Sequence, residues 1–353
     1  MSKINQDSAK HQEEKEEVII KEDLRDRGLP TELLELILSK LIFVVDIINF
    51  HAVCKTWRSI TVSVPPPCQL PPPLPYADSS YPLLFQLDGD HNKYRVLHTL
   101  YNYTWIMDFP PQVRDGRKEI CFSKYGWSLL KACIINTEFC IPYAFLFNPL
   151  TQEIIKLPAI PDYHGYPQCM FFTCPPSHWN CLVVAISLSY SIYVHKLGKA
   201  DWKQHPYFHN FEPISHPILC QGLWYCLGHR RKLIVFDIRN NKPSWIVHKD
   251  VIPSRRKVSA HLTALVEHNG QLLVVFIRGR RRRPYILKFD LETKSCVPIR
   301  SLGKDALFIS KGASFSQRAI VSGTQNKIFL PILRTKTDLF QFYSLATWKY
   351  CRS

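Results

Sequence analysis

The sequence lacks any apolar run long enough to cross a bilayer. No uncharged apolar stretch approaches the ~20 residues that a transmembrane helix needs, and the polar N-terminus MSKINQDSAKHQEEKEE has no apolar signal-peptide core. These absences predict a soluble intracellular protein of the nucleus, the cytoplasm or both, with no membrane partner.

Recognisable catalytic motifs are also missing. The chain has no P-loop, no dinucleotide-binding fingerprint and no GxSxG, and its His and Asp residues are scattered without a nucleophile and base at motif spacing. We therefore expect no enzyme activity and no cofactor. An active site built from residues far apart in the chain stays an alternative, because a motif search does not detect one.

Cysteine is present, with 12 residues, but no secretory signal accompanies it. The cysteines stand singly inside apolar runs, as Cys133, Cys226 and Cys296 do. In an intracellular protein this usage predicts reduced, buried thiols that pack as small hydrophobic groups.

One segment, CMFFTCPPSHWNC, has the residue types of a zinc site. Cys169, Cys174, His178 and Cys181 would supply four soft ligands. Their spacing is not a usual zinc pattern, the chain has no paired CxxC, and Cys181 begins an apolar strand. The favoured interpretation is therefore no metal site.

The composition is that of a folded, aromatic-rich protein. Hydrophobic residues make up 46% of the 353 residues, with 20 Phe, 16 Tyr and 8 Trp, which excludes a disordered chain. This length favours a small module plus one large domain.

The pattern along the chain supports that division. Residues 1–27 form a charged leader, and residues 28–62 have helical periodicity, with Leu33, Leu34, Ile37, Leu38 and Leu41 on one stripe and Pro30 suited to the first turn. Two shorter helices are expected at about 46–52 and 54–60. Residues 63–80 are a proline-rich connector, predicted to be extended.

Residues 81–353 read as strands that repeat loosely. Apolar strand, polar turn and closing strand recur with turns near residues 148, 197, 238 and 291, and two more units are expected near 82–109 and 307–348. Periods of 40 to 50 residues with about four strands each are typical of a β-propeller. The fold predicted is α+β and multidomain, with three small helices followed by a propeller of about six blades; an irregular β-sandwich is the alternative.

The helical segment resembles the F-box. The resemblance rests on Leu29-Pro30, Glu32-Leu33-Leu34, Ile37-Leu38, Leu41, Asp46-Ile47, Phe50 and Val53-Cys54-Lys55 with Trp57-Arg58. It implies docking on the Skp-type adaptor of a cullin–RING ubiquitin ligase, and through that adaptor to a cullin. Large aliphatic and aromatic anchors dominate such interfaces.

The remainder resembles the C-terminal domain of plant F-box proteins with a KIB-type β-propeller. The matching segments are Gly126-Trp127-Ser128-Leu129-Leu130, Leu146 to Thr151, Ile155 to Pro158, Cys181 to Val184, Ser301-Leu302-Gly303, Ala306-Leu307-Phe308 and Trp348-Lys349-Tyr350. The resemblance implies a non-catalytic substrate receptor of an SCF-type (Skp–cullin–F-box) ligase, whose propeller holds an unknown target protein for ubiquitination.

The apolar residues of the F-box segment divide between an adaptor surface and an internal core, and the sequence does not assign them. The adaptor-binding candidates are Leu29, Pro30, Leu33, Ile37, Leu38, Val53, Cys54 and Trp57. Leu34, Leu41 and Phe50 are the candidates for holding the helices together.

Basic residues concentrate in the C-terminal part. Residues 217–353 contain 25 Lys and Arg but only seven Asp and Glu. Arg230, Arg231 and Lys232, and then Arg280, Arg281, Arg282 and Arg283, are expected at equivalent tips of successive blades, where they could bind an acidic target. Solvated turns, a nuclear-import signal, and a nucleic-acid-binding propeller that uses the F-box only for assembly are the alternatives.

Overall fold

The computed structural model describes residues 29–40, 50–60, 83–88, 92–98, 103–114, 116–135, 140–161, 167, 169–187, 191–206, 211–238, 243–249, 251–252, 262–277, 283–293, 295–319, 323–331 and 340–352. The expected leader and connector lie outside these residues. The chain divides into two compact units, residues 1–82 and Leu83–Ser353.

The part of the first unit that the structure describes is helical. It contains α2 (Thr31–Lys40), a helical turn at residues 50–52 and α4 (Lys55–Ser59). The backbone N–H groups of Leu33 and Leu34 both donate to the carbonyl of Pro30 at 3.1 Å, so α2 begins directly after that proline. This position suits proline, which has no N–H to contribute.

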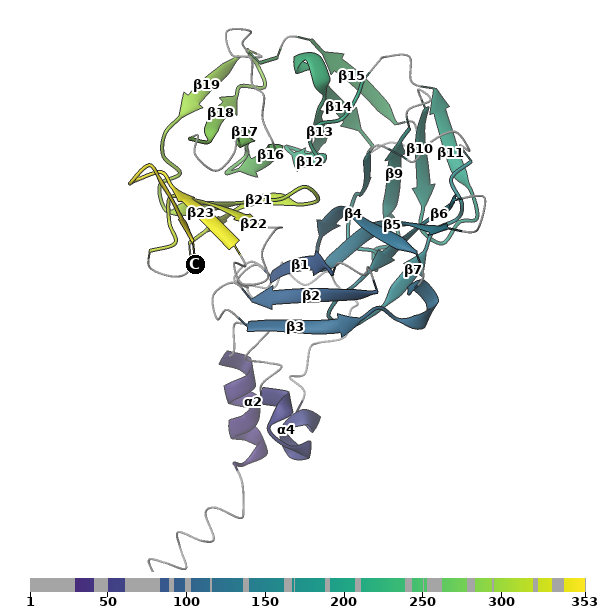
Figure 1. The fold of residues 1–353 in the computed structure, drawn as a ribbon, viewed down its shortest axis with the longest axis vertical. Coiled ribbons are helices and arrows are strands. Elements are labelled where there is room, and N and C mark those ends of the chain that lie inside the picture. Colours follow the sequence, from purple (N-terminus) through teal and green to yellow (C-terminus); the bar gives the residue numbers. More distant parts are fainter. Residues whose placement is uncertain are drawn as a thin grey trace, which may run out of the picture. The chain divides into compact units, whose positions relative to one another are not determined.

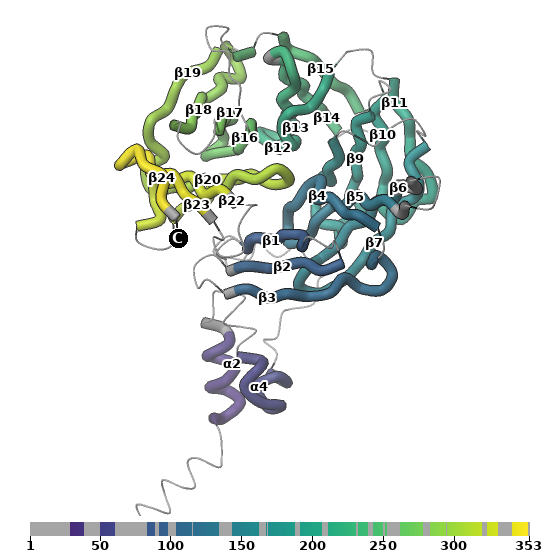
Figure 2. Tube along the Cα trace, viewed as in Figure 1, coloured from purple at the N-terminus to yellow at the C-terminus, as the bar shows by residue number. Residues whose placement is uncertain are grey.

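The second unit is a β-propeller of six sheets placed around a ring (Figures 1 and 2). Blade 1 consists of β1 (Leu83–Leu87), β2 (Lys93–His98) and β3 (Tyr103–Asp108), and a short 3-10 turn η1 (Pro111–Val113) follows it. Blade 2 consists of β4 (Arg117–Lys124), β5 (Trp127–Ile135), β6 (Cys140–Phe147) and β7 (Ile154–Lys156). Blade 3 consists of β8 (Cys169–Phe172), β9 (Leu182–Ile186), β10 (Ser191–Lys196) and β11 (Trp202–Pro206).

The ring continues with blades of the same kind and one larger sheet. Blade 4 consists of β12 (Ile218–Cys220), β13 (Leu223–Leu227), β14 (Leu233–Asp237) and β15 (Ser244–His248), with the 3-10 turn η2 (His229–Arg231) between β13 and β14. Blade 5 consists of β16 (Leu262–His268), β17 (Gln271–Ile277), β18 (Tyr285–Phe289) and β19 (Cys296–Ile299). Blade 6 consists of β20 (Asp305–Ile309), β21 (Ser314–Arg318), β22 (Lys327–Pro331), β23 (Phe340–Ser344) and β24 (Lys349–Arg352), in the order β21-β20-β22-β23-β24.

This architecture confirms the predicted fold class. The turns expected near residues 148, 197, 238 and 291 each join the third strand to the fourth in blades 2 to 5, and the two additional units correspond to blades 1 and 6. The six-bladed ring excludes the alternative of an irregular β-sandwich. Buried Leu97 of blade 1 packs with Ala306 and Phe329 of blade 6, so apolar contact closes the ring between the first and last blades.

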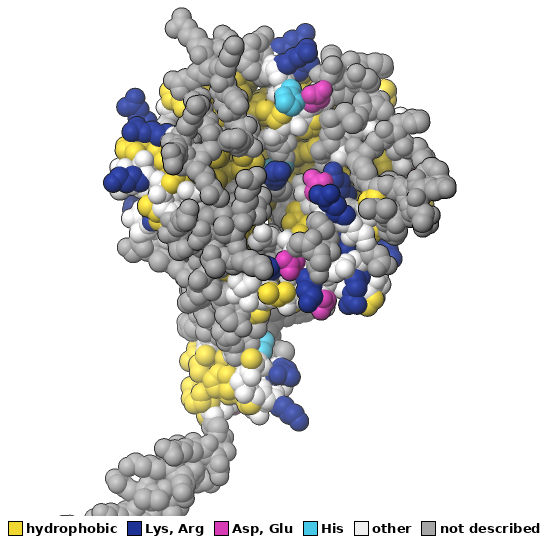
Figure 3. Space-filling view, in the orientation of Figure 1, with side chains coloured by type: hydrophobic (Ala, Val, Ile, Leu, Met, Phe, Trp, Pro, Cys, Tyr) yellow, Lys and Arg dark blue, Asp and Glu magenta, His cyan; other side chains and the backbone are white. Residues whose placement is uncertain are grey.

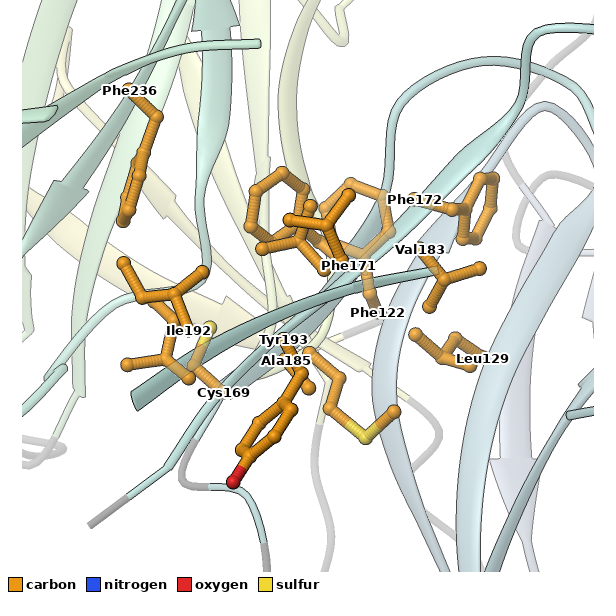
Figure 4. Packing of buried hydrophobic residues seen from close by; sticks show 14 of the residues in the cluster. Phe122, Leu129, Cys169, Phe171, Phe172, Val183, Ala185, Ile192, Tyr193 and Phe236 are labelled. Carbon is orange, nitrogen blue, oxygen red and sulfur yellow. The ribbon is translucent and has the colours of Figure 1, made fainter. Parts of the chain in front are cut away.

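The largest core lies between blades 2, 3 and 4. Figure 4 shows Phe122 of β4, Phe171 and Phe172 of β8 and Phe236 of β14 among its members. Every residue of β8 is buried, because a blade packs a neighbour on each of its faces. Strands that are packed on both faces form continuous apolar runs rather than alternating ones.

Blade 6 sends the hairpin β20–β21 across the ring (Figure 1). At one end, the Ser316 hydroxyl donates to the carbonyl of Glu267 in β16 at 2.9 Å; at the tip, Gly312 accepts a hydrogen bond from the N–H of Ser123 in β4, also at 2.9 Å. Blades 5 and 2 are opposite one another in a six-bladed ring, so a hairpin that contacts both must cross its middle. A register shift in β4 between Ile120 and Phe122 lies where this tip packs.

The described cysteines depart from the prediction of reduced, buried thiols at two positions, Cys133 and the exposed Cys54. Nine of them are free, including buried Cys226 and half-buried Cys296, as the sequence predicted. Cys133, expected to be a reduced thiol, is instead disulfide-bonded. The expectation was wrong there because it came from the inferred compartment, which does not show which thiols the fold brings together.

Candidate functional site

One face of the helical unit exposes large apolar side chains. Leu29, Leu33, Leu36 and Val53 are 43%, 45%, 53% and 59% exposed, and Pro30 and Cys54 are exposed beside them in the sequence. Leu33 and Leu36 are spaced i and i+3 in α2, so helical geometry places them on one side of that helix. Figure 3 shows hydrophobic side chains gathered on this unit. We call Leu29, Pro30, Leu33, Leu36, Val53 and Cys54 the outer apolar face.

The opposite side of α2 forms the small core of this unit. Leu34, Leu38, Phe50 and Ile60 are buried together, with Ile37 and Trp57 partly buried against them. The Trp57 ring lies 4.6 Å from that of Phe50 between centroids. Helix α2 therefore has two apolar faces, one satisfied inside the unit and one exposed.

These placements sort the adaptor-binding candidates. Leu29, Pro30, Leu33, Val53 and Cys54 are exposed, while Ile37 and Trp57 offer only part of their surface. Leu38 is 8% exposed, so its assignment to the adaptor surface is corrected: it belongs with the internal core. The core candidates Leu34 and Phe50 are buried as expected, and Leu41 lies outside the described residues.

Sequence reasoning missed Leu36. The stripe through Leu33, Leu34, Ile37, Leu38 and Leu41 treated the helix as having one apolar side, and Leu36 falls off that stripe. The signal that could have found it is the i, i+3 spacing of Leu33 and Leu36, which gives the helix a second apolar side. Two apolar sets on one short helix indicate that one side packs against the core of the unit and that the other side is available to bind a partner.

The basic tips occupy equivalent connections in neighbouring blades. Arg230 and Arg231 lie in η2, which joins β13 to β14, with Lys232 directly after it; Arg283 ends the connection from β17 to β18. Both connections join the second strand of a blade to the third, as the repeat pattern predicted. Arg230 is exposed with φ of 54°, and Arg283 lies over the Trp348 ring at 4.9 Å. Arg280, Arg281 and Arg282 lie outside the described residues.

The residues of the zinc alternative engage other groups. The Cys181 thiol lies 3.0 Å from the carbonyl of Cys174, and Nδ1 of His178 accepts the N–H of Asn180 at 3.2 Å. Burial raises the pKa of the Cys181 thiol to about 12. Within the described ranges, no group of three or more His, Cys, Asp or Glu side chains is arranged to hold a metal ion.

Comparison with known proteins matches both units. Residues 27–64 match the F-box-like family, and residues 102–343 match the KIB1-4 beta-propeller family. The chain belongs to the KIB1-4 beta-propeller family. It is thus an F-box protein with a propeller, and such families are typically non-catalytic adaptors.

The curated relatives are plant F-box proteins. F-box protein At3g56470 of Arabidopsis thaliana is 27% identical over 301 residues, covering 82% of this chain and 74% of that protein. F-box/kelch-repeat proteins At3g18720 and At1g57790 of the same plant are 25% and 24% identical, each covering 92% of this chain and 85% and 88% of the relative.

None of the helices that the structure describes is long and apolar enough to span a membrane.

Proposed function

We propose that this KIB1-4 propeller protein is the substrate-receptor subunit of an SCF-type E3 ubiquitin ligase and has no catalytic step of its own. Its F-box unit binds a Skp-type adaptor, and through it a cullin, while its propeller holds a target protein. The observation that supports this most directly is the outer apolar face, which lies within the segment that matches the F-box-like family.

The physical argument concerns the size of that unit. Four large aliphatic side chains exposed on so few residues form the kind of apolar patch that often marks an interaction site. Each of these side chains is about half exposed, so burying the remainder on an adaptor would contribute about 1 kcal/mol each, roughly half the value for full burial. Because the unit also has its own core, it can present this face without first having to fold around the partner.

The mechanism is proximity. The ligase supplies the chemistry, and the receptor holds a target lysine near the charged ubiquitin-conjugating enzyme. Tethering converts an encounter between separate molecules into one within a complex, at an effective concentration that reaches the millimolar range or above. No residue of this chain needs to touch the reacting bond.

The test is co-purification of the full-length protein with a plant Skp-type adaptor, beside Leu33→Asp combined with Val53→Asp. Both positions are exposed, so the variant should fold, yet it places two charges in an apolar interface and should lose at least about a hundredfold in affinity. Glu35→Gln, an exposed change on the same helix, is the matched control and should bind like the wild type. Failure of a well-folded wild type to bind, or equal binding by the double variant, would contradict the proposal.

Added salt gives a second check. Apolar docking should change little between low and moderate salt, because screening acts on charges and not on apolar burial. A steep loss of adaptor binding with salt would mean that basic residues, rather than the outer apolar face, mediate the contact.

A further inference from the structure

The indole ring of Trp179 is the most exposed large apolar side chain among the described residues, at 76%. It lies in the connection between β8 and β9 of blade 3, and neither the adaptor contact nor the propeller core uses it. Tryptophan is seldom this exposed, because its large ring favours burial. It is also one of the residues that most often dominate binding at protein interfaces. This connection is therefore a candidate binding surface.

The connection holds the ring in a defined place. At its base, the N–H of Thr173 donates to the carbonyl of Leu182 at 3.0 Å, and the N–H of Leu182 donates back to Oγ1 of Thr173 at 3.0 Å. Closer to the tip, the N–H of His178 donates to the carbonyl of Pro175 at 2.9 Å, and the N–H of Cys181 donates to the carbonyl of His178 at 3.0 Å. A loop that its own hydrogen bonds already hold loses little conformational freedom when a partner binds.

A second turn brings positive charge to the same place. The N–H of Leu197 donates to the carbonyl of Cys181 at 3.1 Å, which joins the turn between β10 and β11 to the connection that carries Trp179. The N–H of Lys199 donates to the carbonyl of Lys196 at 3.1 Å and closes that turn. The Nζ atom of Lys196 lies 4.9 Å from the centroid of the Trp179 ring. We call Trp179, Lys196 and Lys199 the Trp179 surface.

The two lysines of this surface have no counter-charge. Lys196 is half-buried and Lys199 is exposed, and neither side chain forms a hydrogen bond or an ion pair with a residue that the structure describes. The exposed carboxylate of Asp201, which follows in the chain, forms no ion pair with either of them. A partner that covers the Trp179 ring also covers the Lys196 amine beside it. Because burying an unpaired charge is unfavourable, such a partner has to supply a negative group.

We propose that the Trp179 surface docks an acidic segment of the target protein, in which a large apolar side chain is flanked by carboxylates. The apolar side chain packs on the exposed part of the Trp179 ring, and the carboxylates pair with the ammonium groups of Lys196 and Lys199. This inference rests on the proposed function, because it assumes that the propeller holds a protein target.

A single strand of nucleic acid is the rival occupant, since bases also stack on aromatic rings. Such binding combines a positively charged groove with several rings that take successive bases. Across the two joined turns, residues 173–181 and 196–201, Trp179 is the one exposed aromatic side chain. One ring and two lysines provide few of the contacts that a strand requires, so the structure favours a protein segment.

The test uses the full-length protein labelled with 5-fluorotryptophan and followed by fluorine NMR. The Trp179 signal is assigned by its loss in Trp179→Phe. The probe is N-acetyl-Glu-Leu-Glu amide; the Gln-Leu-Gln peptide lacks its charges, the Glu-Gly-Glu peptide lacks its apolar side chain, and an oligothymidylate represents the rival. Each is titrated at constant ionic strength. We expect a saturable shift of the Trp179 signal with the Glu-Leu-Glu probe, and an affinity at least about fivefold lower for each of the others.

Matched variants locate the effect. Lys196→Met keeps the length of the side chain but removes its charge, and should weaken binding of the Glu-Leu-Glu probe about three- to tenfold. Lys196→Arg keeps a cation that can lie over the ring and should bind within about twofold of the wild type. Lys203→Met is the control, because Lys203 is an exposed lysine of β11 in the same blade but outside both turns. It makes the same change in net charge and should leave the affinity unchanged.

The outcomes separate the alternatives. The surface would be overturned by the lack of a saturable Trp179 shift, by equal affinities of wild type and Lys196→Met, or by an equal loss in Lys203→Met. Binding of the oligothymidylate as tight as that of the Glu-Leu-Glu probe would overturn the choice of a protein partner. The assay contains no adaptor, so failed adaptor co-purification would contradict the ligase role without changing this measurement. Failure of the peptide titration would leave adaptor docking unaffected.

Discussion

The burial of His216 predicts a specific dependence of stability on pH. Burial lowers the pKa of this histidine from its ordinary value of 6.5 to about 4; the nearby charge of Lys124 also lowers it, while the Ser314 carbonyl raises it. The folded protein therefore keeps the ring neutral between those pH values, whereas the unfolded chain binds a proton. Stability is complete above about pH 6.5 and falls as the pH decreases toward 4, below which this group causes no further loss.

The size of the effect follows from those two pKa values. Their separation corresponds to about 3 kcal/mol of unfolding free energy, lost across that window. The measurement is urea unfolding of wild type and His216→Gln at pH 7, 6, 5 and 4, followed by tryptophan fluorescence. Other groups titrate alike in both proteins, so the difference between the two free energies isolates His216.

We expect the wild type to lose about 3 kcal/mol relative to His216→Gln between pH 7 and pH 4. A difference that is constant across this range would refute the reasoning, as would a pKa near 6.5 for His216 measured by NMR. In Lys124→Met, the removal of a neighbouring positive charge should raise the pKa of His216 in the folded protein, so the window narrows from its lower end and less stability is lost.

Two further predictions concern packing. Leu34→Ala in the core of the helical unit should destabilise that unit by about 2–5 kcal/mol, whereas Leu36→Ala on the outer apolar face should change its stability by less than about 0.5 kcal/mol. The rate of proteolysis within the first 82 residues measures both effects. Equal effects of the two substitutions would contradict the assignment of the two faces. Gly228→Ala would place a Cβ 2.5 Å from the Phe211 ring and should lower propeller stability by about 1–3 kcal/mol in urea unfolding. Gly312→Ala, whose Cβ would lie 3.1 Å from Ile120, should lower the free energy of unfolding by less. The reverse order of the two effects would contradict the packing described.

Turn chemistry explains why the repeat was readable in the sequence. In blade 2, Oδ1 of Asn148 accepts the N–H groups of Leu150 and Thr151, and in blade 5, Oδ1 of Asp290 accepts those of Glu292 and Thr293. Asn and Asp favour such turns because a short side chain can bond the backbone two and three residues ahead. Each turn links two neighbouring strands, so a local signal was enough to locate it.

The division of the F-box apolar residues required the tertiary structure. Leu33 and Leu34 are adjacent and chemically identical, yet one is exposed and the other fully buried. Periodicity gives the spacing of a helix but not which side meets Phe50 and Ile60, because that contact joins residues from different helices. Leu38 was misassigned for this reason, and Leu36 was missed.

The contact between Lys124 and Trp224 was likewise beyond sequence analysis. The two residues are a hundred positions apart and have no motif spacing. They meet only because the ring brings blades 2 and 4 toward one axis.

The sequence by itself therefore determined the two-part organisation, the F-box resemblance and the repeated four-strand unit, because each depends on contacts between residues close in the chain. The tertiary structure alone decided which leucines face outward, that β20–β21 crosses the ring, and which side chains meet between blades 2 and 4. These depend on packing between distant segments, and side-chain burial is a property of that packing rather than of local spacing.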